Sequence, residues 1–125
     1  MTHFFQRVRE FNATFGIPTQ EEPRIESHSR IRRFKEILYE EVQEADAIMD
    51  VAELADWLGD VIVYCTSEAY RHGIPIEQVL SIIMESNMSK LGADGKPIIE
   101  NGKVQKGPGY WKPEPKIRHL LLGIK

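Results

Sequence analysis

Hydrophobic residues recur every three or four positions along most of the chain before residue 92, which is the spacing of amphipathic helices. A first short helix is predicted to end at Gly16, where a Gly-Ile-Pro segment interrupts the pattern. Residues 19–24, with Pro18 and Pro23 at their edges, are interpreted as a loop. The aromatic stripe of the first helix is interpreted as core; its members are Phe4, Phe5, Val8, Phe11 and Phe15.

Three longer helices are predicted after this loop. The second spans about 27–49 and the third about 51–72, with Gly73 suited to a left-handed cap after it. The fourth covers roughly 76–91 and follows Pro75, a residue favoured in the first turn of a helix. No strand-like alternation of useful length precedes residue 92, so the pattern predicts an all-α, four-helix-bundle-like fold.

The segment 92–125 differs from the helical part, 1–91, because it is rich in Gly, Pro and Lys. These residues predict an irregular tail, apart from a small hairpin that Asn101-Gly102 would favour as a two-residue turn. At 125 residues the whole chain is long enough for one domain with one core, and too short for two comfortable ones.

Composition narrows the function classes. With 42% hydrophobic and 28% charged residues and a net charge of -3, the chain is typical of a soluble globular protein. Its mild acidity argues against general binding of nucleic-acid polymers, and no window resembles a signal peptide or a membrane span. The single cysteine, Cys65, cannot form an internal disulfide and is expected to be a buried, inert thiol. A cytoplasmic protein is therefore expected.

Carboxylates gather in two sectors of the predicted helical wheels. Glu41 is the informative one, because it falls on the apolar face of the second helix, where a charge needs a partner. A single acidic residue on a helix is usually solvated or salt-bridged, but two such clusters on sequential helices are harder to explain in that way. The first cluster consists of Glu40, Glu41 and Glu44, and the second of Glu53, Asp56 and Asp60.

Two inward-facing acidic clusters repel each other by several kcal/mol unless a cation binds between them. None of the four histidines falls in either cluster, and an all-oxygen donor set favours Mg²⁺, or Mn²⁺, over zinc, copper or iron. Magnesium prefers to bridge to phosphates, so phosphoanhydride chemistry is the natural use of such a site. The third helix is apolar nearly all round, which predicts burial in a bundle or in a homodimer or homotetramer.

At these residues the chain resembles the all-alpha nucleoside triphosphate pyrophosphohydrolases, the group that includes MazG-like enzymes and phosphoribosyl-ATP pyrophosphohydrolase. Their signature is Glu-x-x-Glu, a spacer, and Glu-x-x-Asp. Glu41-Val42-Gln43-Glu44 matches the first half. The second half fits in two registers: Glu53-Leu54-Ala55-Asp56 has a short spacer, whereas a register ending at Asp60 has the usual spacer but places Trp57 where Glu is expected.

The resemblance extends over roughly residues 34–113. Asn87 and Lys90 match an acid-x-Asn-x-x-basic stretch, and the Lys-rich segment after them resembles the tail of one MazG-like subfamily. Residues 87–112 contain five lysines and two acidic residues. This excess of positive charge is what a triphosphate would need near an acidic metal cluster. The expected substrate-binding residues are Asn87, Lys90, Lys103, Lys106 and Tyr110, although Tyr110 could equally pack the tail onto the bundle.

The resemblance implies a magnesium-dependent hydrolase that cuts the α–β linkage of a nucleoside triphosphate and releases the monophosphate and pyrophosphate. Glu40 would orient or deprotonate the attacking water. Phosphoribosyl-ATP hydrolysis in histidine biosynthesis and a non-catalytic helical interaction module are alternatives; a di-iron bundle would need Glu-x-x-His pairs, which the chain lacks. The expected metal ligands are Glu41, Glu44, Glu53, Asp56 and Asp60.

Overall fold

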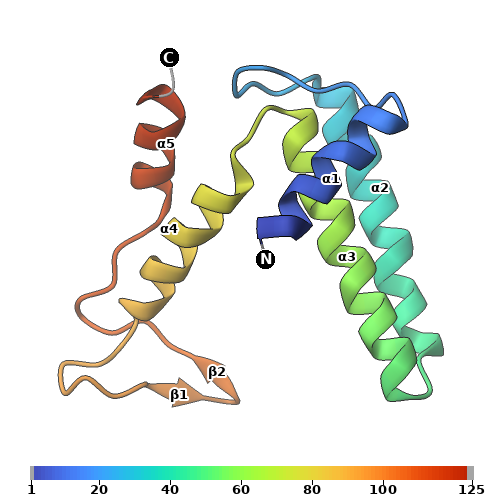
Figure 1. Cartoon of the computed structure of the whole chain (residues 1–125). Coiled ribbons are helices and arrows are strands. Elements are labelled where there is room, and N and C mark those ends of the chain that lie inside the picture. The colour runs from blue at the N-terminus through green and yellow to red at the C-terminus, as the bar shows by residue number, and fades with distance from the viewer. Residues whose placement is uncertain (1, 124–125) are drawn as a thin grey trace. The chain divides into compact units, whose positions relative to one another are not determined.

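The computed structural model describes residues 2–123, apart from the side chain of residue 2. Over this range the chain forms five α-helices, one short 3-10 helix and one two-stranded hairpin (Figure 1). These elements divide into two compact units, one ending at Pro75 and the other beginning at Ile76. The mostly helical architecture predicted from the sequence is confirmed, while the assignment of residues 1–125 to a single domain stays a prediction.

The first unit consists of three helices arranged around α3. Helix α1 spans Thr2–Thr14, α2 spans His28–Glu44 and α3 spans Val51–Arg71; both α1 and α2 pack against α3. Figure 1 shows α2 and α3 running antiparallel, joined by the short 3-10 helix η1 (Ala45–Ala47). The C-terminal end of α2 therefore lies beside the N-terminal part of α3.

Side-chain caps fix the starts of α2 and α3. The Ser27 hydroxyl accepts the backbone N–H of Arg30 at 3.0 Å, so α2 begins as predicted. At the start of α3, Asp50 accepts the N–H of Glu53 at 2.8 Å, and the Glu53 carboxylate accepts the N–H of Met49 at 2.8 Å. This variant of the capping box, in which Glu53 bonds the residue before the N-cap, fixes the direction in which the chain enters α3. Helix α2 ends five residues before the predicted position, because η1 and this cap reverse the chain.

The core of the first unit is small and is centred on the C-terminal half of α3. Val8, Ala69 and Tyr70 are buried, and Asn12 is fully buried with its amide bonded to Ser67. The predicted aromatic core stripe is only partly right, because α1 meets α3 through the face that carries Val8 and Asn12. Phe11 and Phe15 lie off that face and are exposed, at 41% and 71%.

The apolar surface of α3 is likewise open within the single chain, so burial inside the bundle is only partly met and burial in an oligomer stays a prediction. Its N-terminal half packs against α2 alone, so its other faces stay accessible. Cys65 is exposed, which contradicts its predicted burial. The exposed apolar residues on α3 are Val51, Leu54, Leu58, Ile62, Val63 and Tyr64.

The second unit contains α4 (Ile76–Met88), the hairpin strands β1 (Ile99–Glu100) and β2 (Lys103–Val104), and α5 (Glu114–Gly123). The predicted Asn101-Gly102 turn is confirmed: φ is 52° at Asn101 and 71° at Gly102, the signs that a type I′ turn requires. Helix α4 ends three residues earlier than predicted. No helix among residues 2–123 is long and apolar enough to span a membrane.

Helix α5 corrects the prediction of an irregular tail. The proline content of the tail predicts no helix there, yet Pro115 is the second residue of α5, and the first turn of a helix needs no N–H from that position. The residues after it, 116–122, contain neither Gly nor Pro and continue the helix. Proline thus marks the start of this helix rather than its absence.

Candidate active site

The five acids predicted as metal ligands border one pocket of about 360 Å³. The pocket lies where the C-terminal end of α2 passes the N-terminal half of α3, so it is formed entirely within the first unit. Five of its eight lining residues are acidic and none is Lys, Arg or His. The lining residues are Glu41, Glu44, Ala47, Ile48, Glu53, Asp56, Trp57 and Asp60.

Glu41 is the buried member of this acidic group, with 8% of its surface exposed. Burial is the largest cause that raises the pKa of Glu41, followed by the like charges of Glu44 and Asp60. Interaction with the Tyr64 hydroxyl opposes the rise in the pKa of Glu41. The same contact, after burial and the charge of Glu41, raises the pKa of Tyr64. The helical-wheel argument that Glu41 sits on an apolar face and needs a partner is consistent with this position.

Glu53 and Trp57 have structural partners at the pocket. The Glu53 carboxylate is engaged by the Met49 N–H in the capping box, and the Trp57 indole N–H donates to the Glu41 carbonyl oxygen at 2.6 Å. Trp57 therefore ties α3 to α2 at the position where one register of the signature expects Glu. Glu44, Asp56 and Asp60 are exposed at the pocket wall and have no such hydrogen bond among the described residues.

The donor set suits a hard divalent cation, although the acidic side chains do not form a closed site as they stand. Among residues 2–123, no three His, Cys, Asp or Glu side chains are placed to hold a metal ion. All the charged groups at the pocket are carboxylates, and Mg²⁺ prefers such oxygens and keeps several waters. Burial, and after it the like charges of Glu44 and Asp60, raise the pKa of Glu41, and no basic residue lines the pocket. A cation would relieve that repulsion.

Glu40, the predicted water-activating residue, is exposed on α2 and does not line the acidic pocket. Its catalytic role stays a prediction.

The predicted substrate-binding residues all belong to the second unit. Asn87 is exposed near the end of α4, and Lys90 follows that helix. Lys103 is in β2, and the Lys106 ammonium lies over the Tyr110 ring at 5.1 Å. The tail returns to the end of α4, where Gly107 donates its N–H to the Lys90 carbonyl at 2.8 Å. Their approach to the acids of the first unit stays a prediction.

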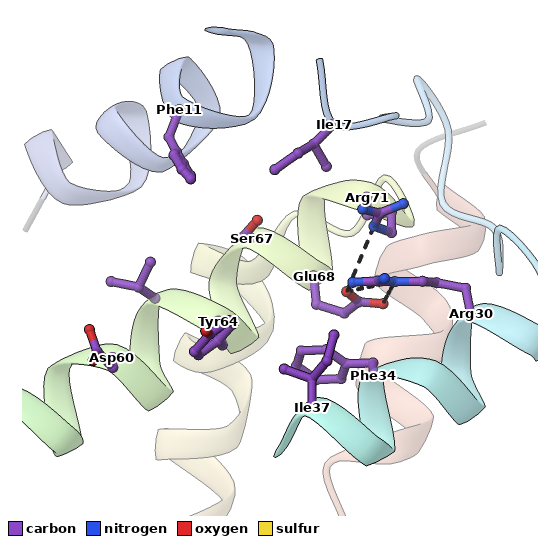
Figure 2. Close-up of a pocket in the computed structure, with 11 residues that line it drawn as sticks. Phe11, Ile17, Arg30, Phe34, Ile37, Asp60, Tyr64, Ser67, Glu68 and Arg71 are labelled. Carbon is purple, nitrogen blue, oxygen red and sulfur yellow. Dashed lines mark hydrogen bonds and ion pairs between the residues drawn. The ribbon is translucent and has the colours of Figure 1, made fainter. Parts of the chain in front are cut away.

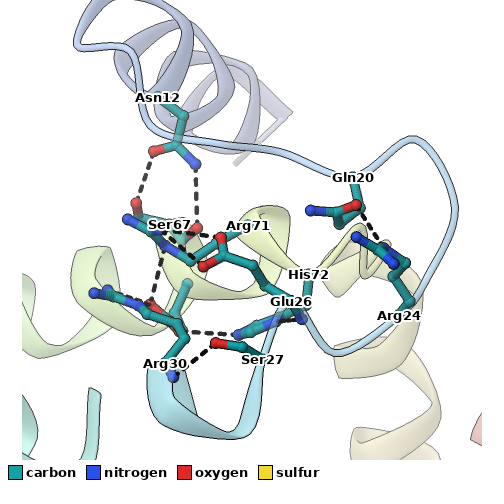
Figure 3. A network of polar contacts seen from close by, with 10 residues as sticks. Asn12, Gln20, Arg24, Glu26, Ser27, Arg30, Ser67, Arg71 and His72 are labelled. Carbon is teal, nitrogen blue, oxygen red and sulfur yellow. Dashed lines mark hydrogen bonds and ion pairs between the residues drawn. The ribbon is translucent and has the colours of Figure 1, made fainter. Parts of the chain in front are cut away.

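A buried charged cluster at the C-terminal end of α3 was missed by sequence analysis (Figure 3). Glu68 accepts hydrogen bonds from the Arg30 guanidinium and bonds to His72 Nε2 at 2.9 Å. His72 Nδ1 accepts the N–H of Glu26 at 2.9 Å, so the ring is neutral and Nε2 is its donor. Arg71 pairs with Glu26 at 3.1 Å. The i, i+4 spacing of Glu68 and His72 on an apolar helix was the available signal.

The chain matches no protein-family model and no curated protein. Among solved structures, it is similar to a protein from Exiguobacterium sp. 255-15 described as a putative NTP pyrophosphohydrolase. The TM-score is 0.51 at 22% sequence identity, and the match covers 97% of this chain and 95% of that protein. The two chains therefore share a fold over almost their entire length.

Proposed function

We propose that this chain is a magnesium-dependent nucleoside triphosphate pyrophosphohydrolase that cleaves the α–β phosphoanhydride. The observation that carries the proposal is the pocket between α2 and α3, bordered by five carboxylates and no basic residue. The fold shared with the Exiguobacterium protein supports it. Such a concentration of negative charge suits a divalent cation together with the phosphate oxygens that the cation would share.

Glu41, Glu44 and Asp60 would hold the magnesium, with Asp56 or Glu53 completing the set. When bound, magnesium supplies Lewis-acid polarisation of the phosphate oxygens. Tyr64 interacts with the Glu41 carboxylate, and Trp57 holds the backbone of α2 against α3. These two contacts pre-organise the acidic wall of the pocket before substrate arrives.

The remaining roles come from the chain's basic residues and from Glu40. Lys90, Lys103 and Lys106 would neutralise charge on the departing pyrophosphate, with Asn87 and Tyr110 contacting the nucleotide. Glu40 would orient or deprotonate the water that attacks in line. Products are the nucleoside monophosphate and pyrophosphate.

The test is pyrophosphate release from a panel of nucleoside triphosphates and phosphoribosyl-ATP, with and without Mg²⁺. Glu44→Ala and Asp60→Ala should each abolish release while the helical circular dichroism is retained. Asp46→Ala, an exposed acid on η1 outside the pocket lining, should keep wild-type turnover. Full turnover in both pocket variants would reject the metal role. Preference for phosphoribosyl-ATP would instead support a histidine-biosynthetic hydrolase.

A non-catalytic interaction module of the same fold is the second candidate. Trp57 stands at an expected Glu position, and the described carboxylates do not form a closed metal site. This function would be supported by magnesium-independent folding together with no pyrophosphate release from any nucleotide in the panel.

We also propose self-association into a homodimer or homotetramer. Leu54, Leu58 and Ile62 form a stripe one helical turn apart on α3 and are 39%, 48% and 54% exposed. A second copy would remove this apolar stripe from water.

A further inference from the structure

A second cavity in the first unit adjoins the acidic pocket (Figure 2). Its volume is about 320 Å³, at the lower end of the range of small-molecule sites, which is about 300–1,000 Å³. Asp60 borders both cavities, and Tyr64, which influences the pKa of Glu41, lines this one. A ligand seated in this cavity could therefore extend a charged group to the acidic wall.

The apolar lining of the cavity combines aromatic side chains from three helices with the aliphatic side chains of Ile17, Ile37 and Val63. Figure 2 shows Phe11 on α1, Phe34 on α2 and Tyr64 on α3 around the same space, with Ile17 and Ile37 beside them. Aromatic rings favour flat, polarisable partners that can stack against their faces. A planar heterocycle fits this lining better than an aliphatic chain does.

The polar end of the cavity is rich in hydrogen-bond donors. Arg30 engages Glu68 through Nε and one terminal nitrogen, and Arg71 engages Glu26 through one terminal nitrogen. Each guanidinium carries five N–H groups, so donors are left over in both. No guanidinium nitrogen here is both buried and without a hydrogen-bond partner, and Arg71 Nε lies 3.8 Å from Glu68 Oε1.

The carboxylate at this end is already engaged. The two Glu68 oxygens receive Arg30 and His72, while the Ser67 hydroxyl donates to Asn12 and keeps its acceptor lone pairs. The cavity therefore offers donors to a ligand edge that carries acceptors.

The net charge at this end favours a neutral ligand edge over a phosphate. Two arginines are balanced by Glu26 and Glu68, and His72 is neutral by its hydrogen bonds. A phosphate needs an excess of positive charge, which this cluster does not provide. The phosphates of a nucleotide would instead extend toward the acidic pocket, where a cation can join them.

We propose that this cavity binds the nucleobase and sugar of the substrate and selects an oxopurine, such as guanine or hypoxanthine, over adenine. Adjacent acceptors on an oxopurine, O6 and N7, match the paired donors of a guanidinium. Adenine presents an amino group in place of O6, so a donor would face a donor. This inference rests on the proposed function, since it assigns the base-specific part of the same substrate.

The first measurement is the ratio of kcat/KM for GTP to that for ATP in the full chain with Mg²⁺. The wild-type ratio should exceed one, and Arg71→Gln should reduce it by about tenfold, mainly by raising KM for GTP. Phe11→Ala touches no ion pair and should raise KM for both nucleotides. Arg33→Gln, an exposed arginine on α2 that does not line the cavity, is the matched control and should leave the ratio unchanged.

A second measurement separates this inference from the proposed function. Isothermal titration of the metal-free protein with GMP and with AMP needs no hydrolysis. Tighter binding of GMP, lost in Arg71→Gln and Phe11→Ala but kept in Arg33→Gln, would support the cavity assignment even if no triphosphate were hydrolysed.

Three results would overturn the inference while the hydrolase assignment stands. These are equal use of GTP and ATP by an active enzyme, an unchanged ratio in a folded Arg71→Gln variant, and loss of inorganic pyrophosphate binding in that variant. Loss of pyrophosphate binding in Arg71→Gln would show that Arg30 and Arg71 bind phosphate rather than a nucleobase.

Discussion

At the scale of single residues, Glu68 is the side chain whose environment has the clearest consequence for stability. Burial alone would raise the pKa of Glu68, but hydrogen bonds from Arg30 and His72 outweigh it and hold the pKa below the ordinary value of 4.5. Its side chain is 10% exposed, so the pair with Arg30 is largely shielded from solvent. The carboxylate is therefore part of the packing between α2 and α3.

A lowered pKa in the folded state gives a defined pH dependence. The stabilisation from Glu68 is fully present above pH 4.5, its ordinary value, and is lost as the pH falls through the lower value of the folded state. Urea unfolding followed from pH 7 to pH 3 should show wild-type stability declining at the acidic end. Glu68→Gln should show a smaller decline there, because its side chain does not titrate; identical pH profiles would contradict this assignment.

The same variant should be destabilised at neutral pH. Removing one partner of a buried ion pair leaves the other unpaired, and Glu68→Gln is expected to lower the free energy of unfolding by about 3 kcal/mol. Glu36→Gln is the matched control, because Glu36 pairs with Arg33 on the exposed surface of α2. It should cost less than about 1 kcal/mol. Equal decreases in the free energy of unfolding of the two variants would show that the buried ion pair of Glu68 stabilises the fold no more than the exposed pair of Glu36.

The two registers of the acidic signature can be separated at residue scale. Glu53→Gln keeps an oxygen for the Met49 N–H, so the cap of α3 should survive while the charge is lost. We expect Glu53→Gln to retain much of the pyrophosphate-releasing activity and Asp60→Asn to lose it, with melting temperatures close to that of the wild type. The reverse order would favour the register in which Glu53 is a principal ligand.

At the scale of elements, the helices were predictable wherever stop signals and periodicity agreed. Gly16, Gly73 and the Asn101-Gly102 turn all have positive φ, so the predicted breaks and hairpin occur where the chain needs residues that tolerate that region. Helix α5 was missed because proline density alone does not distinguish a helix start from a loop. Phe11, Phe15 and Cys65 were predicted to be buried but are exposed. Periodicity identifies an apolar face of a helix without identifying what covers it.

In the candidate site, too, features set within one helix were predictable from sequence, whereas features set by packing between helices were not. The helical wheel placed Glu41 and Glu44 on one side of α2 because that geometry is fixed within one helix. The cavity beside Asp60 was not predicted, since it depends on where α1 lies against α3. Arg30 and Glu68 are 38 residues apart, and nothing in local spacing pairs them.

The cap at the start of α3 provides a test at element scale. Asp50→Ala removes the acceptor of the Glu53 N–H and should lower the free energy of unfolding by about 1 kcal/mol. Chemical denaturation measures the free energy of unfolding of Asp50→Ala and of the control Asp46→Ala, whose side chain caps no α-helix. A loss no larger than in the control would show that the cap does not contribute.

At the scale of the whole molecule, the exposed stripe on α3 bears on assembly. A glutamate within it, as in Leu58→Glu, would place a charge in the proposed interface and should shift the protein to a monomer in light scattering. Tyr39→Glu changes a 63% exposed side chain on α2, outside the stripe, and should leave the oligomer intact. A wild-type chain that is already monomeric at micromolar concentration would contradict the proposed self-association.

The contact at Gly73 has a consequence for how this protein can diverge. A side chain there would meet the Glu22 carbonyl at 2.5 Å, and φ is +68°. The connection between α1 and α2 is also bonded to His72 through the backbone of Arg24 and Glu26. A segment that looks like an ordinary surface loop is therefore intolerant of insertions, and length variation among homologues should accumulate instead around Gly95, where a side chain would meet open space.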